Sequence, residues 1–164
     1  GITIDLKTIE TLGKLLPNNI VAMKESSGNR DFMLKTIKEI PSLSVFSGSD
    51  SLAVEACRNG GVGAITSTSN LSAKLLCYLL KNYEKNFSSE RFKLLRDLQD
   101  QIRDTLFTQE PISTMKALLS IIHKEDQWNR VNAPLQIISD PNNNSSISRL
   151  MELMRKMDQY LADA

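Results

Sequence analysis

The spacing of apolar side chains changes twice within the first residues of the chain. Positions 6, 9, 12, 15 and 16 are apolar, which is the spacing of one helix face, and Asp5 stands where a helix cap belongs. Pro17 ends this pattern. The next apolar run, residues 20–23, is too short for a helix, follows turn residues and leads into Lys24. It predicts a strand that is buried on both faces, as in a parallel sheet.

The same alternation of strand and helix recurs along the chain. The predicted segments are helix 5–16, strand 20–23, helix 30–40, strand 43–46, helix 51–59, strand 62–65 and helix 71–85, followed by helices at about 88–107, 111–123 and 145–162. Proline residues and the polar run 140–144 separate the last helices. Short polar loops follow each predicted strand.

Strands that alternate with helices predict an α/β fold with a parallel sheet. Strand, polar loop and helix in succession are typical of the (β/α)8 TIM barrel, which needs about 250 residues, whereas this chain has 164. We therefore expect the C-terminal part of a TIM barrel, with its last three β/α units in residues 1–86. A C-terminal helical bundle is expected in residues 87–164. Because the first residue is Gly1 rather than Met, we expect a chain that begins within a longer protein, or a processed or excised segment.

Composition excludes several classes of function. The chain is 41% hydrophobic and 24% charged, with a net charge of +1, as in ordinary globular proteins. It has no basic stripe for nucleic acid and no apolar run of about 18 residues to span a membrane. One histidine, His123, is too few for a zinc site or a Ser-His-Asp triad within the chain, so no metal is expected. Cys57 and Cys77 lack CxxC spacing and predict reduced, buried side chains, which suits the cytoplasm.

Lys24 is the first candidate for chemistry. Strand side chains alternate, so Lys24 shares a face with the small Ala22 and stands at the C-terminal end of its strand, where barrel enzymes keep their chemistry. Removal from water disfavours the ammonium form of a lysine, and a neutral amine can attack a ketone to form an imine. Most lysines that follow an apolar run are solvated strand ends, so this pattern alone favours the ordinary interpretation.

Two further loops carry candidate residues. In residues 45–50 (VFSGSD), Gly48 permits a close backbone approach to a ligand, and Asp50 could accept hydrogen bonds from substrate hydroxyls. Asp50 could instead cap a helix that begins at Ser51, and the residues alone favour this role. Residues 60–70 (GGVGAITSTSN) form the third strand and its loop, and a serine and threonine cluster by itself is usually an ordinary polar loop.

These three stretches together resemble the dihydrodipicolinate synthase / N-acetylneuraminate lyase family. Residues 20–29 (IVAMKESSGN) are similar to the lysine motif of that family, and residues 45–50 to the next strand, which ends in Ser/Ala-Gly-x-Asp. Residues 60–70 are similar to the last barrel strand, and residues 128–135 (WNRVNAPL) to an Arg-x-Pro-apolar segment with altered spacing. The motifs follow in order at the intervals of the family, so the resemblance covers essentially the whole chain.

The resemblance implies a class-I aldolase or lyase that forms a Schiff base. Lys24 would bind pyruvate or a related 2-keto acid as an imine, without any cofactor. Gly48, Asp50 and Ser67 would contact the substrate, and the carbonyl of Ile65 would face the lysine. The resemblance also implies a homo-oligomer when the protein is full length. The loop that holds the keto-acid carboxylate and the proton-shuttling tyrosine of the family would lie before Gly1.

The subfamily is indicated in two directions. The continuation ESSGN after Lys24 favours a dihydrodipicolinate-synthase-like condensation of pyruvate with an aldehyde, which is our first expectation. Asp50 and Ser67 favour the alternative, a 2-keto-3-deoxy sugar-acid aldolase or N-acetylneuraminate lyase, and residues 109–116 (QEPISTMK) depart from the Asn-Pro-x-Pro-x-Lys of synthases. A catalytically incomplete barrel fragment is the third possibility. A phosphate-binding module around residues 47–49 lacks a glycine-rich fingerprint.

Overall fold

The computed structural model describes residues 4–162. The chain folds into two compact units. One, the sheet unit, consists of Gly1–Ser67 and Tyr78–Phe87, and the other, the helical unit, consists of Thr68–Cys77 and Ser88–Ala164. The division therefore does not fall at a single point in the chain, and the boundary expected between residues 86 and 87 stays a prediction.

The sheet unit is built on three parallel strands. They are β1 (Ala22–Glu25), β2 (Ser44–Ser47) and β3 (Gly63–Ala64), hydrogen-bonded in the order β1-β2-β3. This order confirms the predicted parallel α/β arrangement. Strand β1 begins two residues later than the apolar run and includes Lys24 and Glu25, because its register pairs Ala22 with Ser44 and Glu25 with Ser47.

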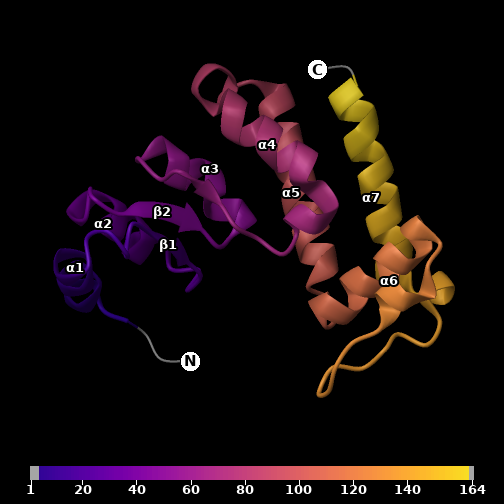
Figure 1. Ribbon diagram of the computed structural model, residues 1–164. Coiled ribbons are helices and arrows are strands. Elements are labelled where there is room, and N and C mark those ends of the chain that lie inside the picture. The colour runs from indigo at the N-terminus through magenta and orange to yellow at the C-terminus, as the bar shows by residue number, and fades with distance from the viewer. Residues whose placement is uncertain (1–3, 163–164) are drawn as a thin grey trace. The chain divides into compact units, whose positions relative to one another are not determined.

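Helices alternate with these strands along the first part of the chain, as Figure 1 shows: one precedes β1, two connect the strands and one follows β3. They are α1 (Leu6–Leu15), α2 (Arg30–Glu39), α3 (Asp50–Arg58) and α4 (Ser69–Asn86). The starts of α1 and α2 are set by side-chain caps: Asp5 accepts a hydrogen bond from the Thr8 amide at 2.7 Å, and Asn29 accepts one from the Phe32 amide at 3.0 Å. Both helices therefore lie where the sequence predicts them.

One face of the sheet carries the core of the sheet unit. Met23 of β1 and Val45 of β2 point to the face on which α1 and α2 pack, where Ile9, Ile40 and Leu43 are buried. The alternate residues point the other way, so the register places Lys24, Phe46 and Gly63 together on the opposite face. Lys24 is exposed there and Phe46 is half-buried. The water-poor surroundings expected for Lys24 must therefore come from outside these three strands.

The helical unit has a core of its own. Helices α5 (Glu90–Leu106) and α7 (Ser145–Ala162) pack against each other, and α6 (Pro111–His123) packs against α7. Two short 3-10 helices, Asp126–Asn129 and Pro141–Asn143, lie between α6 and α7. The large apolar side chains that are essentially inaccessible to solvent include Leu75, Phe92, Leu95, Ile102, Leu106, Leu118, Ile147, Leu150 and Leu153. The predicted C-terminal helices are confirmed.

The cysteines differ from the sequence expectation. Cys57 is half-buried, and burial raises the pKa of its thiol, but Cys77 is exposed. The expectation of two buried cysteines is thus wrong for Cys77. The buried stripe of α4 follows Leu71, Leu75 and Leu79 at helical spacing, and position 77 falls outside it. None of the helices between residues 4 and 162 combines the length and apolarity that crossing a membrane demands.

Candidate functional site

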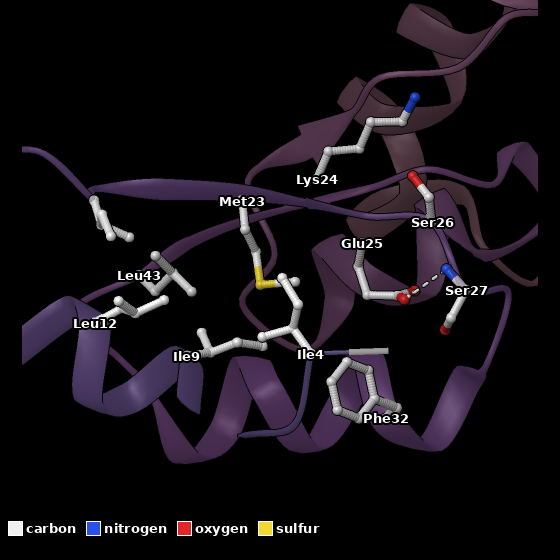
Figure 2. Close-up of a pocket in the computed structure, with 11 residues that line it drawn as sticks. Ile4, Ile9, Leu12, Met23, Lys24, Glu25, Ser26, Ser27, Phe32 and Leu43 are labelled. Atoms are coloured by element: carbon white, nitrogen blue, oxygen red, sulfur yellow. Dashed lines mark hydrogen bonds between the residues drawn. The ribbon is translucent and has the colours of Figure 1, made fainter. Parts of the chain in front are cut away.

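Lys24 is the third residue of β1 and projects from the uncovered face of the sheet. Figure 2 shows its side chain on the side of the strand opposite to Met23 and Glu25. The amine is therefore presented above the sheet, near its C-terminal edge, rather than towards the packed helices. Chemistry at this amine belongs to the face that would line the interior of a closed barrel.

A hollow of ≈ 710 Å³ lies on the other face of β1, between the strand and helices α1 and α2. Its wall is mostly apolar, with side chains of Ile4, Ile9, Leu12, Met23, Phe32 and Leu43 around it (Figure 2). Glu25 is the acidic group in this wall; it is 4% exposed, and its Oε1 accepts a hydrogen bond from the Ser27 amide at 2.7 Å. Lys24 also borders this hollow, but its amine points to the opposite side of the strand (Figure 2), so the hollow is not the place where a ketone would meet the lysine.

Gly48 joins the loop after β2 to the loop after β1. Its amide donates a hydrogen bond to the Glu25 carbonyl at 2.6 Å. A Cβ at this position would lie 2.5 Å from the Glu25 carbonyl oxygen and 2.6 Å from the Ser26 Oγ, so a side chain cannot enter without displacing the loop. The close approach that Gly48 permits here is to the backbone that follows Lys24, and its contact with a ligand stays a prediction.

Asp50 begins α3 rather than capping it. The N-cap of α3 is Ser49, which makes no side-chain capping bond, so the expectation that Asp50 caps a helix beginning at Ser51 is wrong. The Ser47 hydroxyl accepts a hydrogen bond from the Ser49 amide at 3.2 Å and donates one to the Ser49 carbonyl at 2.8 Å, which holds the turn before the helix. Asp50 is 6% exposed, and its Oδ1 accepts a hydrogen bond from the Thr66 hydroxyl at 2.7 Å.

The loop after β3 brings the third strand end to the same edge of the sheet. The Ile65 amide donates a hydrogen bond to the Ser47 carbonyl at 2.9 Å, and the Ile65 side chain is 48% exposed. Ser67 is exposed as well, whereas Thr66 between them is buried at 9% exposure. The structure therefore gathers the loops that carry Gly48, Asp50 and Ile65 at the C-terminal edge that also carries Lys24. Their roles towards a substrate stay predictions.

Thr66 is the residue of this edge that the sequence did not single out. It stands within the cluster TSTSN, in which every position is polar, so composition gives no reason to separate it from its neighbours. The alternation of side chains could have distinguished it: if the extended backbone of β3 continues past Ala64, Thr66 points to the side opposite to Ile65 and Ser67. The partner itself, sixteen residues earlier in the chain, is a tertiary contact.

A model of the dihydrodipicolinate synthetase family matches residues 1–152. Among curated relatives, the chain is similar to the 4-hydroxy-tetrahydrodipicolinate synthase of Hydrogenobaculum sp. (strain Y04AAS1). The identity is 31% over 129 residues, which cover 76% of this chain and 43% of that enzyme. The chain thus spans less than half the length of this curated relative.

Solved structures share the fold of the chain. The 4-hydroxy-tetrahydrodipicolinate synthase of Methylacidiphilum fumariolicum SolV superposes with a TM-score of 0.79 at 21% identity, over 99% of this chain and 52% of that one. A 2-keto-3-deoxygluconate aldolase of Sulfolobus sulfataricus superposes with a TM-score of 0.76 at 18% identity, over 99% and 52%. These similarities confirm the predicted partial TIM barrel with its helical extension. Taken with the family match over most of its length, they lead to one conclusion: the chain belongs to the dihydrodipicolinate synthetase family.

Proposed function

We propose that the chain supplies the lysine of a class-I, pyruvate-dependent aldolase, in which Lys24 forms a Schiff base with the keto acid. The observation that carries the proposal is the position of Lys24 on the open sheet face, at the edge where the loops after β2 and β3 meet. Membership of the family over residues 1–152 supports it. Because the chain spans less than half of its curated relative, the activity belongs to a complete barrel that contains this chain.

The chemistry follows from the properties of an amine. The Lys24 amine adds to the ketone carbon of pyruvate and water leaves, which gives an imine. The protonated imine withdraws electrons, so the neighbouring methyl carbon loses a proton and becomes an enamine. The enamine carbon then attacks the carbonyl carbon of an aldehyde, and a new carbon–carbon bond forms. Hydrolysis returns the free amine of Lys24, and because the imine is the electron sink, the cycle requires no cofactor.

For the second substrate we propose an aldehyde of the kind used in a synthase-type condensation. The names of the similar curated relatives support this choice, as does the sequence ESSGN after Lys24. The competing proposal is cleavage of a 2-keto-3-deoxy sugar acid or of N-acetylneuraminate, for which Asp50 and Ser67 would bind hydroxyls. Solved structures of a 2-keto-3-deoxygluconate aldolase and of CdNal from Clostridium difficile share the fold at 18% and 22% identity. The synthase of Methylacidiphilum fumariolicum SolV shares it at 21%, so the fold does not favour either choice.

Two further properties of the complete protein are part of the proposal. We expect it to work in the cytoplasm, because neither Cys57 nor Cys77 is in a disulfide. We also expect it to assemble from identical subunits, as the resemblance implies. A catalytically incomplete fragment is the competing view of the chain by itself, since three strands do not close a barrel.

The test is to trap the imine. A complete barrel that contains this chain is incubated with pyruvate and borohydride, and the modified lysine is located by peptide mass mapping. We expect the adduct on Lys24 and its absence from both Lys24→Ala and Lys24→Arg, since a guanidinium keeps the charge but does not form the imine. Lys74 and Lys116 serve as internal controls, because they lie on helices α4 and α6. An adduct on either of them, with Lys24 unmodified, contradicts the proposal.

A further inference from the structure

We infer that Thr66 is a positioning residue that sets the choice of aldehyde, because its hydroxyl holds the Asp50 carboxylate inside the protein and away from a hydroxyl-bearing substrate tail. The inference rests on the proposed function and deepens it. Its structural basis is the buried hydrogen bond from the Thr66 Oγ1 to the Asp50 Oδ1, at 2.7 Å.

Both partners of this bond are shielded from water. Asp50 is 6% exposed and Thr66 is 9% exposed, whereas the neighbouring Ile65 and Ser67 are open to solvent. A hydrogen bond to a charged acceptor is stronger than one between neutral groups, and a buried carboxylate that loses its donor is strongly destabilised. A substrate hydroxyl that approached the Oδ1 of Asp50 would therefore compete with the Thr66 hydroxyl for that oxygen.

The backbone on both sides fixes the two residues in this pairing. Asp50 is the first residue of α3, and the turn before it is held by the two hydrogen bonds between Ser47 and Ser49. Thr66 follows Ile65, whose amide is bonded to the Ser47 carbonyl. Ser47 thus anchors both ends of the contact. In addition, threonine is β-branched and has few rotamers, so its hydroxyl does not swing freely.

The consequence concerns selectivity between aldehydes. A site built to hydrogen-bond a substrate hydroxyl rejects analogues that lack it, by large factors, because its polar groups are left unpaired. When the acidic group at this edge already has a protein donor, an aldehyde without hydroxyls leaves nothing unpaired. The Thr66–Asp50 bond therefore favours a short aldehyde whose tail carries no hydroxyl next to the carbonyl, and it disfavours polyhydroxylated tails.

The experiment compares two aldehydes in a complete barrel that contains this chain. Condensation with pyruvate is measured for aspartate semialdehyde and for glyceraldehyde, and the ratio of the two kcat/KM values is the readout. The wild-type protein should prefer the semialdehyde by at least about tenfold, given how strongly buried polar groups discriminate. Thr66→Val removes the hydroxyl and keeps the branched shape, and should shift the ratio towards glyceraldehyde by about tenfold or more. Thr66→Ser keeps the hydroxyl and should restore the wild-type ratio.

A second variant decides the question if Thr66→Val does not fold. In Asp50→Asn the amide oxygen can still accept from Thr66, so the ratio should remain within about threefold of the wild-type ratio, less than the loss of one hydrogen bond would cause. A direct role of Asp50 in binding a hydroxylated tail predicts instead a selective loss with glyceraldehyde. Three outcomes would each overturn the inference. They are a selective loss with glyceraldehyde in Asp50→Asn, a wild-type preference for glyceraldehyde, and an unchanged ratio in a folded Thr66→Val protein. Borohydride trapping with pyruvate is run alongside: an adduct at Lys24 keeps the proposed function intact even if the ratios fail, whereas its absence from wild type rejects the proposed function itself.

Discussion

Ile102 in α5 and Val21 beside β1 are both β-branched apolar residues, yet Ile102 is fully buried and Val21 is 56% exposed. The contrast extends to their surroundings. The helical unit encloses a row of inaccessible side chains, whereas the sheet unit leaves Val21, Val62 and Ile65 about half exposed. The helical unit exposes apolar side chains as well, such as Leu94 at 47% and Ile137 at 56%, but these lie on α5 and in the segment before α7 rather than beside a strand. The sheet unit carries the candidate chemistry on a surface that its own residues do not cover.

The largest effect is expected on the self-association of the isolated chain. A parallel sheet with an open face and an open edge invites pairing with other chains, so the isolated chain should sediment as a mixture of larger species. Val21 and Val62 are exposed residues directly before the two outer strands, and Val21→Lys combined with Val62→Lys should move the chain towards monomer in analytical ultracentrifugation. The matched pair Leu94→Lys and Ile122→Lys alters side chains of similar exposure, 47% and 44%, in the helical unit and should change the distribution little. A monodisperse wild-type monomer would contradict this view of the sheet.

The two units should also respond differently to truncation of an apolar side chain. Ile102→Ala removes fully buried methyl groups and should lower the free energy of unfolding by about 2–5 kcal/mol. Leu15→Ala in α1, where the side chain is 71% exposed, should change it by less than about 0.5 kcal/mol. Urea unfolding followed by far-ultraviolet circular dichroism measures both. Equal losses would remove the distinction between a closed core and an open surface.

Within the sheet unit, alanine substitutions at two glycines should have smaller effects on stability, of opposite sign. Gly48→Ala places a Cβ against the Glu25 carbonyl and Ser26, and should lower the free energy of unfolding by about 1–3 kcal/mol. Gly13→Ala lies within α1 with nothing inside 4 Å of the new atom, and should raise it by about 0.5–1 kcal/mol because alanine loses less backbone freedom in a helix. Opposite signs in thermal melts are the expected result. A neutral Gly48→Ala would mean that the two loops separate easily.

The smallest effect concerns a surface charge of the helical unit. Lys156 and Arg149 contact the two Glu152 carboxylate oxygens at 2.8 and 2.7 Å and lower the Glu152 pKa from 4.5 to about 2. Since the folded pKa is the lower one, these contacts stabilise the fold above pH 4.5, and the contribution is lost as pH falls through about 2. The group is exposed, so the effect on stability is small and should weaken with salt. Carboxyl titration by NMR checks it, and a midpoint near 4.5 at low salt would refute the pairing.

Local sequence patterns predict most of the helices and strands, whereas contacts between distant residues are not predicted. Asp5 and Asn29 cap α1 and α2 because capping depends on residues only three positions away. The apolar run before Lys24 predicts a strand, but the ends of β1 are set by its pairing with Ser44–Ser47, and a run of apolar residues carries no information about that partner. The same holds for Asp50: local sequence favours a helix cap, whereas the structure makes it the first residue of α3 and pairs it with Thr66, sixteen residues later. The candidate site is thus predictable as a set of strand ends, whereas the bonds among its loops are not.

The backbone bond between the Gly48 amide and the Glu25 carbonyl restricts how related sequences can vary. Loops above a barrel usually accept inserted residues independently of one another, which is how one scaffold acquires new specificities. Here an insertion after β1 would carry the β2 loop with it, because the two meet without room for a single Cβ. Length variation should therefore accumulate elsewhere, and the pair of loops should change together or not at all.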